Sequence, residues 1–224
     1  MTTEISSKTA LVPKRRRFVR APFILTDWAR RQFSGVLNFW AGLFLRLGLH
    51  PNTMTFIGVA GNFVAAWFLA QGDFRIGGLL VVAMGAFDAL DGAMARLKGE
   101  SSRWGAFVDS VSDRYSELAI IGGVLWYFVH RGDVLGALLA YLAAFGAVLV
   151  SYIRARAASL GIDIKVGLLT RFERYLVLAP TLVLGLPKIG MAIIAVGAHI
   201  TALQRIAYMR AHVHQHGLHR EETL

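Results

Sequence analysis

The sequence predicts an all-α, polytopic membrane protein with six transmembrane helices preceded by an interfacial amphipathic helix. Three observations predict this class. Hydrophobic residues make up 55% of the 224 positions, and the mean hydropathy of +0.52 exceeds that of a soluble domain. The apolar residues form long runs separated by short polar turns. Four aspartates stand within or beside these runs, where membrane proteins retain acidic groups mainly for function.

Four regions follow one another along the chain. Residues 1–22 are polar and basic, so we expect a disordered cytoplasmic tail and no cleavable signal peptide. This tail either attracts anionic lipid or only orients the chain. An amphipathic helix is expected over 23–48, because its apolar residues recur at helical spacing and its arginines disfavour a transmembrane span. We expect a six-helix membrane domain over 49–210, which contains the candidate catalytic residues. A cytoplasmic C-terminal tail is expected over 211–224.

The predicted spans are bounded by turn residues and prolines. Pro51 breaks the helix that precedes the first span, Gly72 lies in the turn that follows it, and Pro187 lies in the turn before the last span. We expect transmembrane helices over 53–70, 76–94, 104–129, 134–157, 172–186 and 189–209.

Positive charge predicts the orientation of these helices. The net charge of +10 would suggest nucleic acid in a soluble protein. Here it fits anionic lipid and membrane topology, so we expect membrane lipids and no nucleic acid as partners. Only Arg75, Arg131 and Lys188 of the 24 Lys and Arg residues fall in the loops opposite the termini. This bias predicts a multi-pass protein of the cell membrane, with both termini and the candidate site facing the cytoplasm.

Two pairs of aspartates form the candidate metal site. Asp88 and Asp91 stand three residues apart and Asp109 and Asp113 four apart, so each pair lies on one face of a helix. A bare acid inside a membrane helix costs ~2.5–3.5 kcal/mol on insertion scales, so we expect these groups to face the bundle interior and meet cations. Oxygen-only ligands suit Mg²⁺, Mn²⁺ or Ca²⁺ rather than zinc. Two Mg²⁺ ions, or two Mn²⁺ ions, would balance the four carboxylates.

The aspartates belong to a longer pattern. Residues 88–113 read D-x-x-D-G-x-x-A-R, then eight residues, then G-x-x-x-D-x-x-x-D. This pattern resembles the signature of the CDP-alcohol phosphotransferases, which are integral membrane enzymes of phospholipid synthesis. Two other classes stay open. One is a membrane prenyltransferase, whose aspartate-rich motif lacks the D-G-x-x-A-R continuation, and the other is a non-enzymatic membrane scaffold or transporter.

The resemblance implies a reaction and a set of catalytic residues. A phosphatidyl-type group would pass from a CDP-linked lipid, either CDP-diacylglycerol or CDP-archaeol, to the hydroxyl of an alcohol, with release of CMP. Asp88, Asp91 and Asp109 would hold the metal ions. Asp113 would complete the set and act as the general base that deprotonates the acceptor hydroxyl. The resemblance also implies a homodimer.

A second group of residues would bind the CDP-linked lipid. The loop from Pro51 to Met54 matches the family position that borders the cytidine nucleotide, although a helix-start turn would also favour proline there. Small residues after Asp91 would let the nucleotide approach, or would only pack helices. Arg96 would pair with the diphosphate, because it shares a helix face with Asp88. The expected CDP-lipid site is Pro51, Asn52, Thr53, Met54, Gly92, Ala95, Arg96, Ser102 and Gly105.

Cations gather near the cytoplasmic ends of the predicted spans. Their number predicts a second anion pocket for a phosphate-bearing acceptor, because arginine grips phosphate with two hydrogen bonds. Each cation alone could equally be a snorkelling charge. The residues are Arg114, Arg154, Arg156, Lys165, Arg171, Arg174 and Arg205.

Three stretches resemble the phosphatidylinositol phosphate synthase branch of the family. They are Asp113-Arg114, residues 151–157 (SYIRARA) and Gln204-Arg205, and the likeness covers roughly 48–210. Relatives often carry Lys where Arg154 stands and Glu where Ala158 stands. The resemblance implies a phosphorylated polyol as the acceptor, with inositol 1-phosphate as the first candidate and glycerol 3-phosphate as the alternative. The acceptor phosphate would bind Arg114, Arg154, Arg156 and Arg205.

Four histidines, at positions 212, 214, 216 and 219, lie near the C-terminus. We interpret them as part of a solvated tail rather than as a metal site, because a short histidine tract is only a compositional signal.

Overall fold

The chain is almost entirely helical. The computed structural model describes residues 25–99 and 103–216, and these contain seven helices and no strand. The helices are α1 (Leu25–Arg46), α2 (Pro51–Gln71), α3 (Phe74–Lys98), α4 (Arg103–His130), α5 (Val134–Ser159), α6 (Arg171–Val183) and α7 (Pro187–His216). The all-α prediction is confirmed for this part of the chain. The predicted N-terminal tail and the last eight residues of the predicted C-terminal tail lie outside the described residues.

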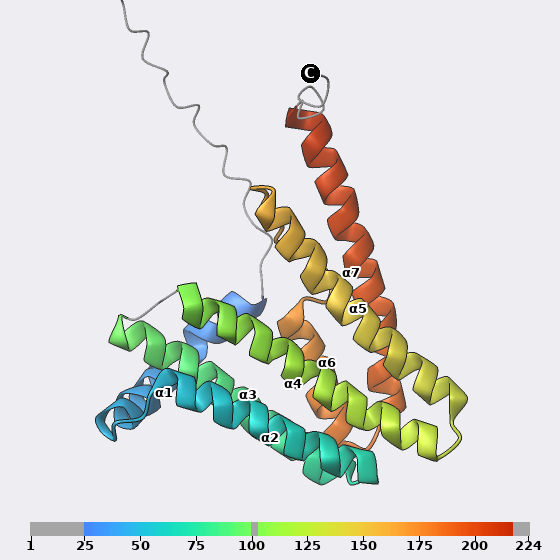
Figure 1. The fold of residues 1–224 in the computed structure, drawn as a ribbon, viewed down its shortest axis with the longest axis horizontal. Coiled ribbons are helices and arrows are strands. Elements are labelled where there is room, and N and C mark those ends of the chain that lie inside the picture. The colour runs from blue at the N-terminus through green and yellow to red at the C-terminus, as the bar shows by residue number, and fades with distance from the viewer. Residues whose placement is uncertain (1–24, 100–102, 217–224) are drawn as a thin grey trace, which may run out of the picture.

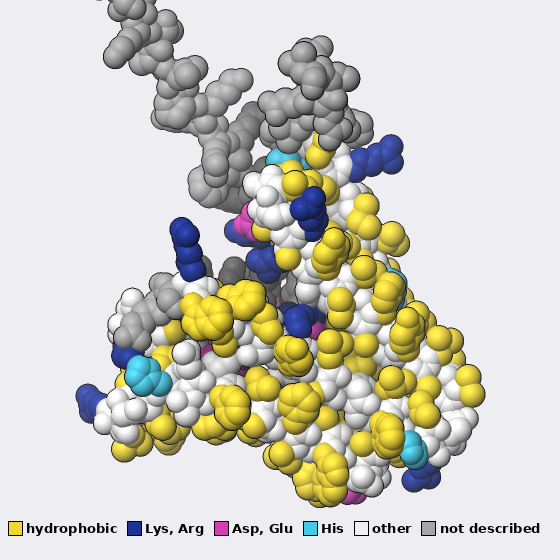
Figure 2. All heavy atoms as spheres, in the orientation of Figure 1, with side chains coloured by type: hydrophobic (Ala, Val, Ile, Leu, Met, Phe, Trp, Pro, Cys, Tyr) yellow, Lys and Arg dark blue, Asp and Glu magenta, His cyan; other side chains and the backbone are white. Residues whose placement is uncertain are grey.

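Four of the helices, α2, α3, α5 and α7, are long and apolar enough to cross a bilayer. Their outer faces carry large hydrophobic side chains, among them Phe56, Trp67 and Leu79, that are exposed in the described part of the chain. Hydrophobic side chains also dominate the face seen in Figure 2. Water would disfavour so large an apolar surface, whereas lipid tails solvate it. The chain is therefore a multi-pass membrane protein.

The helix α2 is the common partner of α3 and α4 (Figure 1). Gly72 turns the chain from α2 into α3: its φ of 93° lies in the left-handed region, and its N–H donates to the carbonyl of Leu69. Gly123 allows α4 to approach α2 closely, because a Cβ at this position would overlap the backbone of Ala66. Since α3 and α4 both pack on α2 and are consecutive in the chain, the end of α3 and the start of α4 lie together. Those two ends carry the four aspartates.

The helices α5 and α7 form a second group and lie side by side, while α6 packs against both α3 and α7 (Figure 1). One continuous core of buried apolar side chains joins the two groups, and it includes Leu69, Val81, Val124, Leu182 and Met191. The helix α6 therefore connects the aspartate-bearing helix α3 to the second group.

A partly exposed ion pair lies at the far end of the bundle, away from the four aspartates. Lys188, at the start of α7, lies 2.5 Å from the carboxylate of Asp133, which precedes α5. The pKa of Asp133 is held below its ordinary value first by the hydrogen bond from Lys188 and then by one from the N–H of Gly136.

Three helix boundaries differ from the predicted spans by three residues or more. The helix α3 continues through Lys98 rather than ending at 94, and Gly99 ends it with a φ of 68°. The helix α7 continues to His216 rather than ending at 209. The helix α6 ends at Val183 rather than at 186, because Gly185 adopts a φ of 71° and the N–H of Leu186 closes a turn onto Thr181. The proline that follows would also disfavour helical backbone at residue 186.

The helix α1 packs against α3. Its Ala41 is buried in a small cluster with Met54, Ala93 and Met94, whereas Phe39 is exposed. The helix expected over 23–48 is thus present as Leu25–Arg46, and it lies next to the helix that carries the first aspartate pair.

Candidate active site

Three of the four aspartates converge. Asp88 and Asp91 come from α3 and Asp109 from α4, and one carboxylate oxygen of each lies within 4.8 Å of the others. The spacing of three residues puts Asp88 and Asp91 on one face of α3, and the packing of α3 and α4 on α2 brings that face toward Asp109. Asp91 is 5% exposed, while Asp88 is partly exposed and Asp109 is exposed.

This carboxylate cluster fits a divalent cation. All three ligands are carboxylate oxygens, which hard cations such as Mg²⁺ and Mn²⁺ prefer. One ligand is deeply buried and two are open to solvent, so an ion held there would keep positions free for a second group. Three carboxylates this close together repel one another when ionised, and a bound cation would relieve that repulsion.

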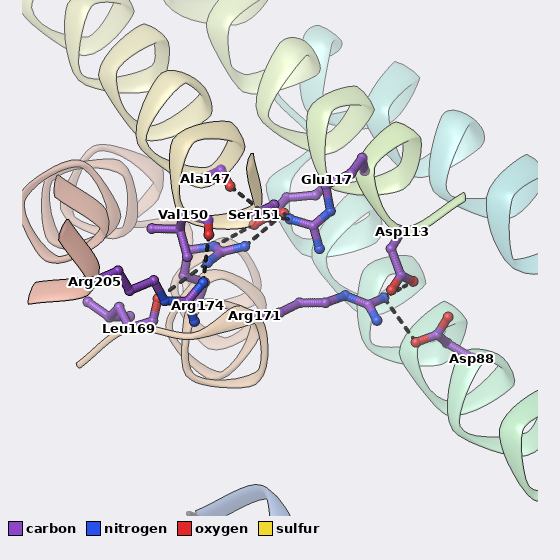
Figure 3. Close-up of polar contacts among 11 residues, drawn as sticks. Asp88, Asp113, Glu117, Ala147, Val150, Ser151, Leu169, Arg171, Arg174 and Arg205 are labelled. Atoms are coloured by element: carbon purple, nitrogen blue, oxygen red, sulfur yellow. Dashed lines mark hydrogen bonds and ion pairs between the residues drawn. The ribbon is translucent and has the colours of Figure 1, made fainter. Parts of the chain in front are cut away.

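Asp113 lies at the edge of the cluster and is paired with an arginine. Its carboxylate, in a residue 7% exposed, forms an ion pair with Arg171 at the start of α6. The same guanidinium also lies 3.1 Å from Asp88. Figure 3 shows Arg171 reaching between the two carboxylates. The sequence had placed Arg171 among the cations at the helix ends but had not placed it against the aspartates.

A threonine that the sequence pattern did not single out contacts the cluster from α2. The hydroxyl of Thr55 donates a hydrogen bond of 2.7 Å to Asp91. Thr55 lies one residue beyond the predicted nucleotide loop 51–54. Its role could not be found from spacing, because the contact depends on how α2 packs against α3.

A buried ionic network lies about one helical turn from Asp113 and Arg171. Glu117 on α4 accepts two hydrogen bonds from Arg174 on α6, at 2.7 and 3.0 Å, and one of 2.6 Å from Arg114. Arg114 also donates to the hydroxyl of Ser151 on α5 at 2.8 Å. Arg174 is 1% exposed, so this network ties α4, α5 and α6 together inside the bundle (Figure 3). Glu117 lies four residues after Asp113, outside the aspartate pattern of residues 88–113, so the motif does not predict its role.

The predicted acceptor cations lie in two environments. Arg205 is 3% exposed and donates to the carbonyl oxygens of Val166 and Val150, at 3.0 and 2.6 Å. Arg154 and Arg156 are exposed at the end of α5.

Several of these arginines lie close enough to one another for their like charges to repel. The positive charges of Arg154 and Arg174 act on Arg205, and those of Arg171 and Arg174 act on Arg114. A cationic region therefore adjoins the carboxylate cluster, made up of Arg114, Arg154, Arg156, Arg174 and Arg205. Glu117 pairs with Arg114 and Arg174 and so balances only part of its charge.

The predicted nucleotide loop lies beside the end of α3. Pro51 is at the first turn of α2, Met54 is buried, and the ring of His50 lies 3.4 Å from the ammonium of Lys98. Asn52 and Thr53 are exposed and Ala95 is partly exposed, while Gly105 stands in the first turn of α4. Ser102 lies outside the described residues.

Arg96 is exposed in the last turn of α3 and folds back along the helix. Its guanidinium lies so close to Gly92 that a Cβ added there would be 3.4 Å away. Arg96 and Gly92 therefore share the helix face that leads to Asp88, as their four-residue spacing predicted.

Comparison with known proteins identifies the family. The family model described as CDP-alcohol phosphatidyltransferase matches residues 48–203. A phosphatidylinositol phosphate synthase of Streptomyces avermitilis is 37% identical over 203 residues, which cover 84% of this chain and 83% of that protein. An archaetidylinositol phosphate synthase of Pyrococcus horikoshii is 36% identical over 163 residues, which cover 71% of this chain and 83% of that protein.

Solved structures of the phosphatidylinositol phosphate synthase of Mycobacterium tuberculosis have a similar fold. The structure with CDP-DAG bound matches with a TM-score of 0.71 at 30% identity and covers 78% of this chain and 93% of that one. The structure in complex with manganese and citrate matches with a TM-score of 0.72, at 30% identity and over 77% of this chain and 88% of that one. The chain carrying the aspartate pattern of residues 88–113 thus belongs to the CDP-alcohol phosphatidyltransferase family.

Proposed function

We propose that this chain transfers a phosphatidyl-type group from a CDP-linked lipid to inositol 1-phosphate, with release of CMP. The observation that carries the proposal is the carboxylate cluster of Asp88, Asp91 and Asp109 directly beside a cationic region. A transferase acting between a diphosphate and a phosphorylated acceptor needs both. The relatives named as phosphatidylinositol phosphate and archaetidylinositol phosphate synthases support the same acceptor and leave the donor lipid open between diacyl and isoprenoid-ether forms.

The aspartates have distinct roles in this proposal. Asp88, Asp91 and Asp109, with Asp113 at their edge, hold two divalent ions, Mg²⁺ or Mn²⁺, which would neutralise the charge that develops on the departing CMP. Asp113 accepts the proton of the acceptor hydroxyl. The position of Asp113 supports this role, because its carboxylate lies between the acidic cluster and the cation Arg171.

The acceptor phosphate binds the cationic region, which in this proposal includes Arg114, Arg154, Arg156 and Arg205. The exposed arginines at the end of α5 are the ones available for direct contact, whereas Arg205 is engaged with two backbone carbonyls. Arg171, whose side chain is 44% exposed, lies beside this region but is paired with Asp88 and Asp113. The hydroxyl of a polyol bound there would face Asp113.

The membrane arrangement is also proposed. All of α2 to α7 cross the bilayer, α1 lies in the interface, and both termini and the site face the cytoplasm, where the positive charge concentrates. The helix α4 has 28 residues, about 42 Å of helix, and is long enough to span. The helix α6, with 13 residues, measures only about 20 Å and spans only together with its flanking turns. In this proposal the membrane catalytic domain comprises residues 49–210. The active form is a homodimer.

Arg96 is expected to bind the diphosphate of the CDP-linked lipid. Replacing Arg96 with alanine should raise the KM for that lipid by about ten- to a hundredfold, because a lost charged hydrogen bond costs ~1.5–3 kcal/mol. Steady-state CMP release at varied lipid concentration measures this effect. The control is Arg75→Ala, which removes an exposed arginine from the other end of α3 and should leave KM unchanged. An unaltered KM for Arg96→Ala would show that Arg96 serves only orientation in the membrane.

The acceptor is identified by a panel assay. Inositol 1-phosphate should support CMP release, glycerol 3-phosphate should support less, and free inositol and serine none, because only a phosphate engages the cationic region. Replacing Arg156 with alanine should raise the KM for inositol 1-phosphate by about ten- to a hundredfold and leave the KM for the CDP-lipid nearly intact. Arg210→Ala, at an exposed position on α7, is the control. Equal rates with free inositol would rule out the phosphate pocket.

A further inference from the structure

The hydrogen bond between Thr55 and Asp91 links α2 to the most deeply buried ligand of the carboxylate cluster. The distance from the Thr55 hydroxyl to Oδ2 of Asp91 is 2.7 Å, which is short enough for a charge-assisted bond. Asp91 is 5% exposed, so water has little access to compete for that oxygen. The other two ligands of the cluster, Asp88 and Asp109, are more open to solvent.

The position of the Thr55 hydroxyl is constrained from its own helix. Threonine is β-branched and has few side-chain conformations in a helix, and its hydroxyl commonly points toward the carbonyl four residues earlier. Here that carbonyl belongs to Pro51 and lies 3.3 Å from the hydroxyl oxygen. The longer distance to Pro51 and the shorter one to Asp91 indicate that the single hydroxyl proton is given to the carboxylate.

We infer that Thr55 is a positioning residue, whose hydroxyl fixes the Asp91 carboxylate in the orientation in which it binds a divalent cation. With Oδ2 held from one side, the carboxylate cannot rotate freely, and one of its oxygens stays within 4.8 Å of an oxygen of Asp88 and of Asp109. Outer partners of this kind orient metal ligands, and their loss typically lowers metal affinity by 10–100-fold. The inference rests on the proposed function only in taking the cluster as a metal site.

A purely structural role for Thr55 would have different consequences. If the hydroxyl only fastened α2 to α3, its removal would lower stability and leave the metal affinity of the folded protein unchanged. A Thr55→Val variant keeps the side-chain shape and removes the hydroxyl, whereas Thr55→Ser keeps the hydroxyl and removes the methyl group. These two substitutions therefore separate hydrogen bonding from packing. Thr55→Ala is a second variant without the hydroxyl, for use if valine prevents folding.

The test is a titration of the full-length protein in detergent micelles with Mn²⁺ alone, in which the electron paramagnetic resonance signal of free Mn²⁺ reports binding. The matched control is Thr181→Val on α6, because the Thr181 hydroxyl is also partly buried and bonded to a carbonyl four residues earlier, at 2.7 Å. We expect Thr55→Val to raise the dissociation constant for Mn²⁺ by about 10–100-fold. Thr55→Ser and Thr181→Val should bind as the wild type does.

The inference is overturned if folded Thr55→Val binds Mn²⁺ as tightly as the wild type, or if Thr55→Ser binds as weakly as Thr55→Val. Its failure is distinct from failure of the proposed reaction. A wild-type protein that binds Mn²⁺ through Asp91 and Thr55 but releases no CMP with inositol 1-phosphate would refute the reaction and support the positioning role. Normal CMP release by the wild type, together with unchanged Mn²⁺ affinity in Thr55→Val, would support the reaction and refute the positioning role.

Discussion

Replacing Asp91 with asparagine should reduce CMP release by at least about a hundredfold, the loss typical of removing one electrostatic contact that stabilises a transition state. Asparagine has nearly the same shape but no charge, and it presents one carboxylate-type oxygen fewer to a cation. Asp91 is also the ligand with the least access to water, so solvent cannot replace the missing oxygen. Asp88→Asn should have an effect of the same order, because both residues belong to the carboxylate cluster.

Two measurements check this prediction. Initial rates of CMP release are compared for the wild type, both variants and Asp163→Asn, an exposed aspartate that pairs only with Lys165 at 3.2 Å among the contacts described. A chelator should abolish the wild-type activity, and added Mg²⁺ or Mn²⁺ should restore it. Asp163→Asn should behave as the wild type. Full activity of folded Asp91→Asn would exclude this cluster as the metal site.

The aspartate cluster could be predicted from sequence because its spacing is local. Residues three or four positions apart on a helix share a face. The sequence alone therefore predicts that the two aspartates of each pair lie side by side. The motif then indicated that the two pairs act together. The convergence of Asp88, Asp91 and Asp109 agrees with that expectation, while Asp113 turns toward Arg171.

The partners of Asp91 and of Glu117 could not be predicted, because each pair joins two helices that are far apart in the sequence. Thr55 lies 36 residues from Asp91, and Arg174 lies 57 residues from Glu117. No local rule selects these pairs, which follow from the packing of α2 on α3 and of α6 near α4. The end of α6 differs from the prediction for another reason. Gly185 adopts a left-handed conformation that ends the helix early, but it stands between two leucines, so the hydropathy pattern continues through the turn.

Replacing Glu117 with glutamine should have the second large effect, a loss of thermal stability. The substitution removes the carboxylate that pairs with two arginines. They are Arg174, which is 1% exposed, and the partly buried Arg114. Removing one member of a buried ion pair typically costs 3–5 kcal/mol, because the remaining charge stays desolvated. The midpoint of thermal unfolding in detergent should therefore fall by roughly 6–20 °C. Circular dichroism at 222 nm follows the loss of helix.

A double variant separates the charge from the shape of this site. Glu117→Met with Arg174→Met removes both desolvated charges and fills the space with apolar side chains, so it should unfold at a higher temperature than Glu117→Gln. Recovery should be incomplete, because Arg114 keeps only its hydrogen bond to Ser151. Lys188→Met is the control, since its pair with Asp133 lies at the exposed end of the bundle and exposed pairs contribute little. If Glu117→Gln unfolds at the wild-type temperature, the network does not contribute to holding α4 against α6.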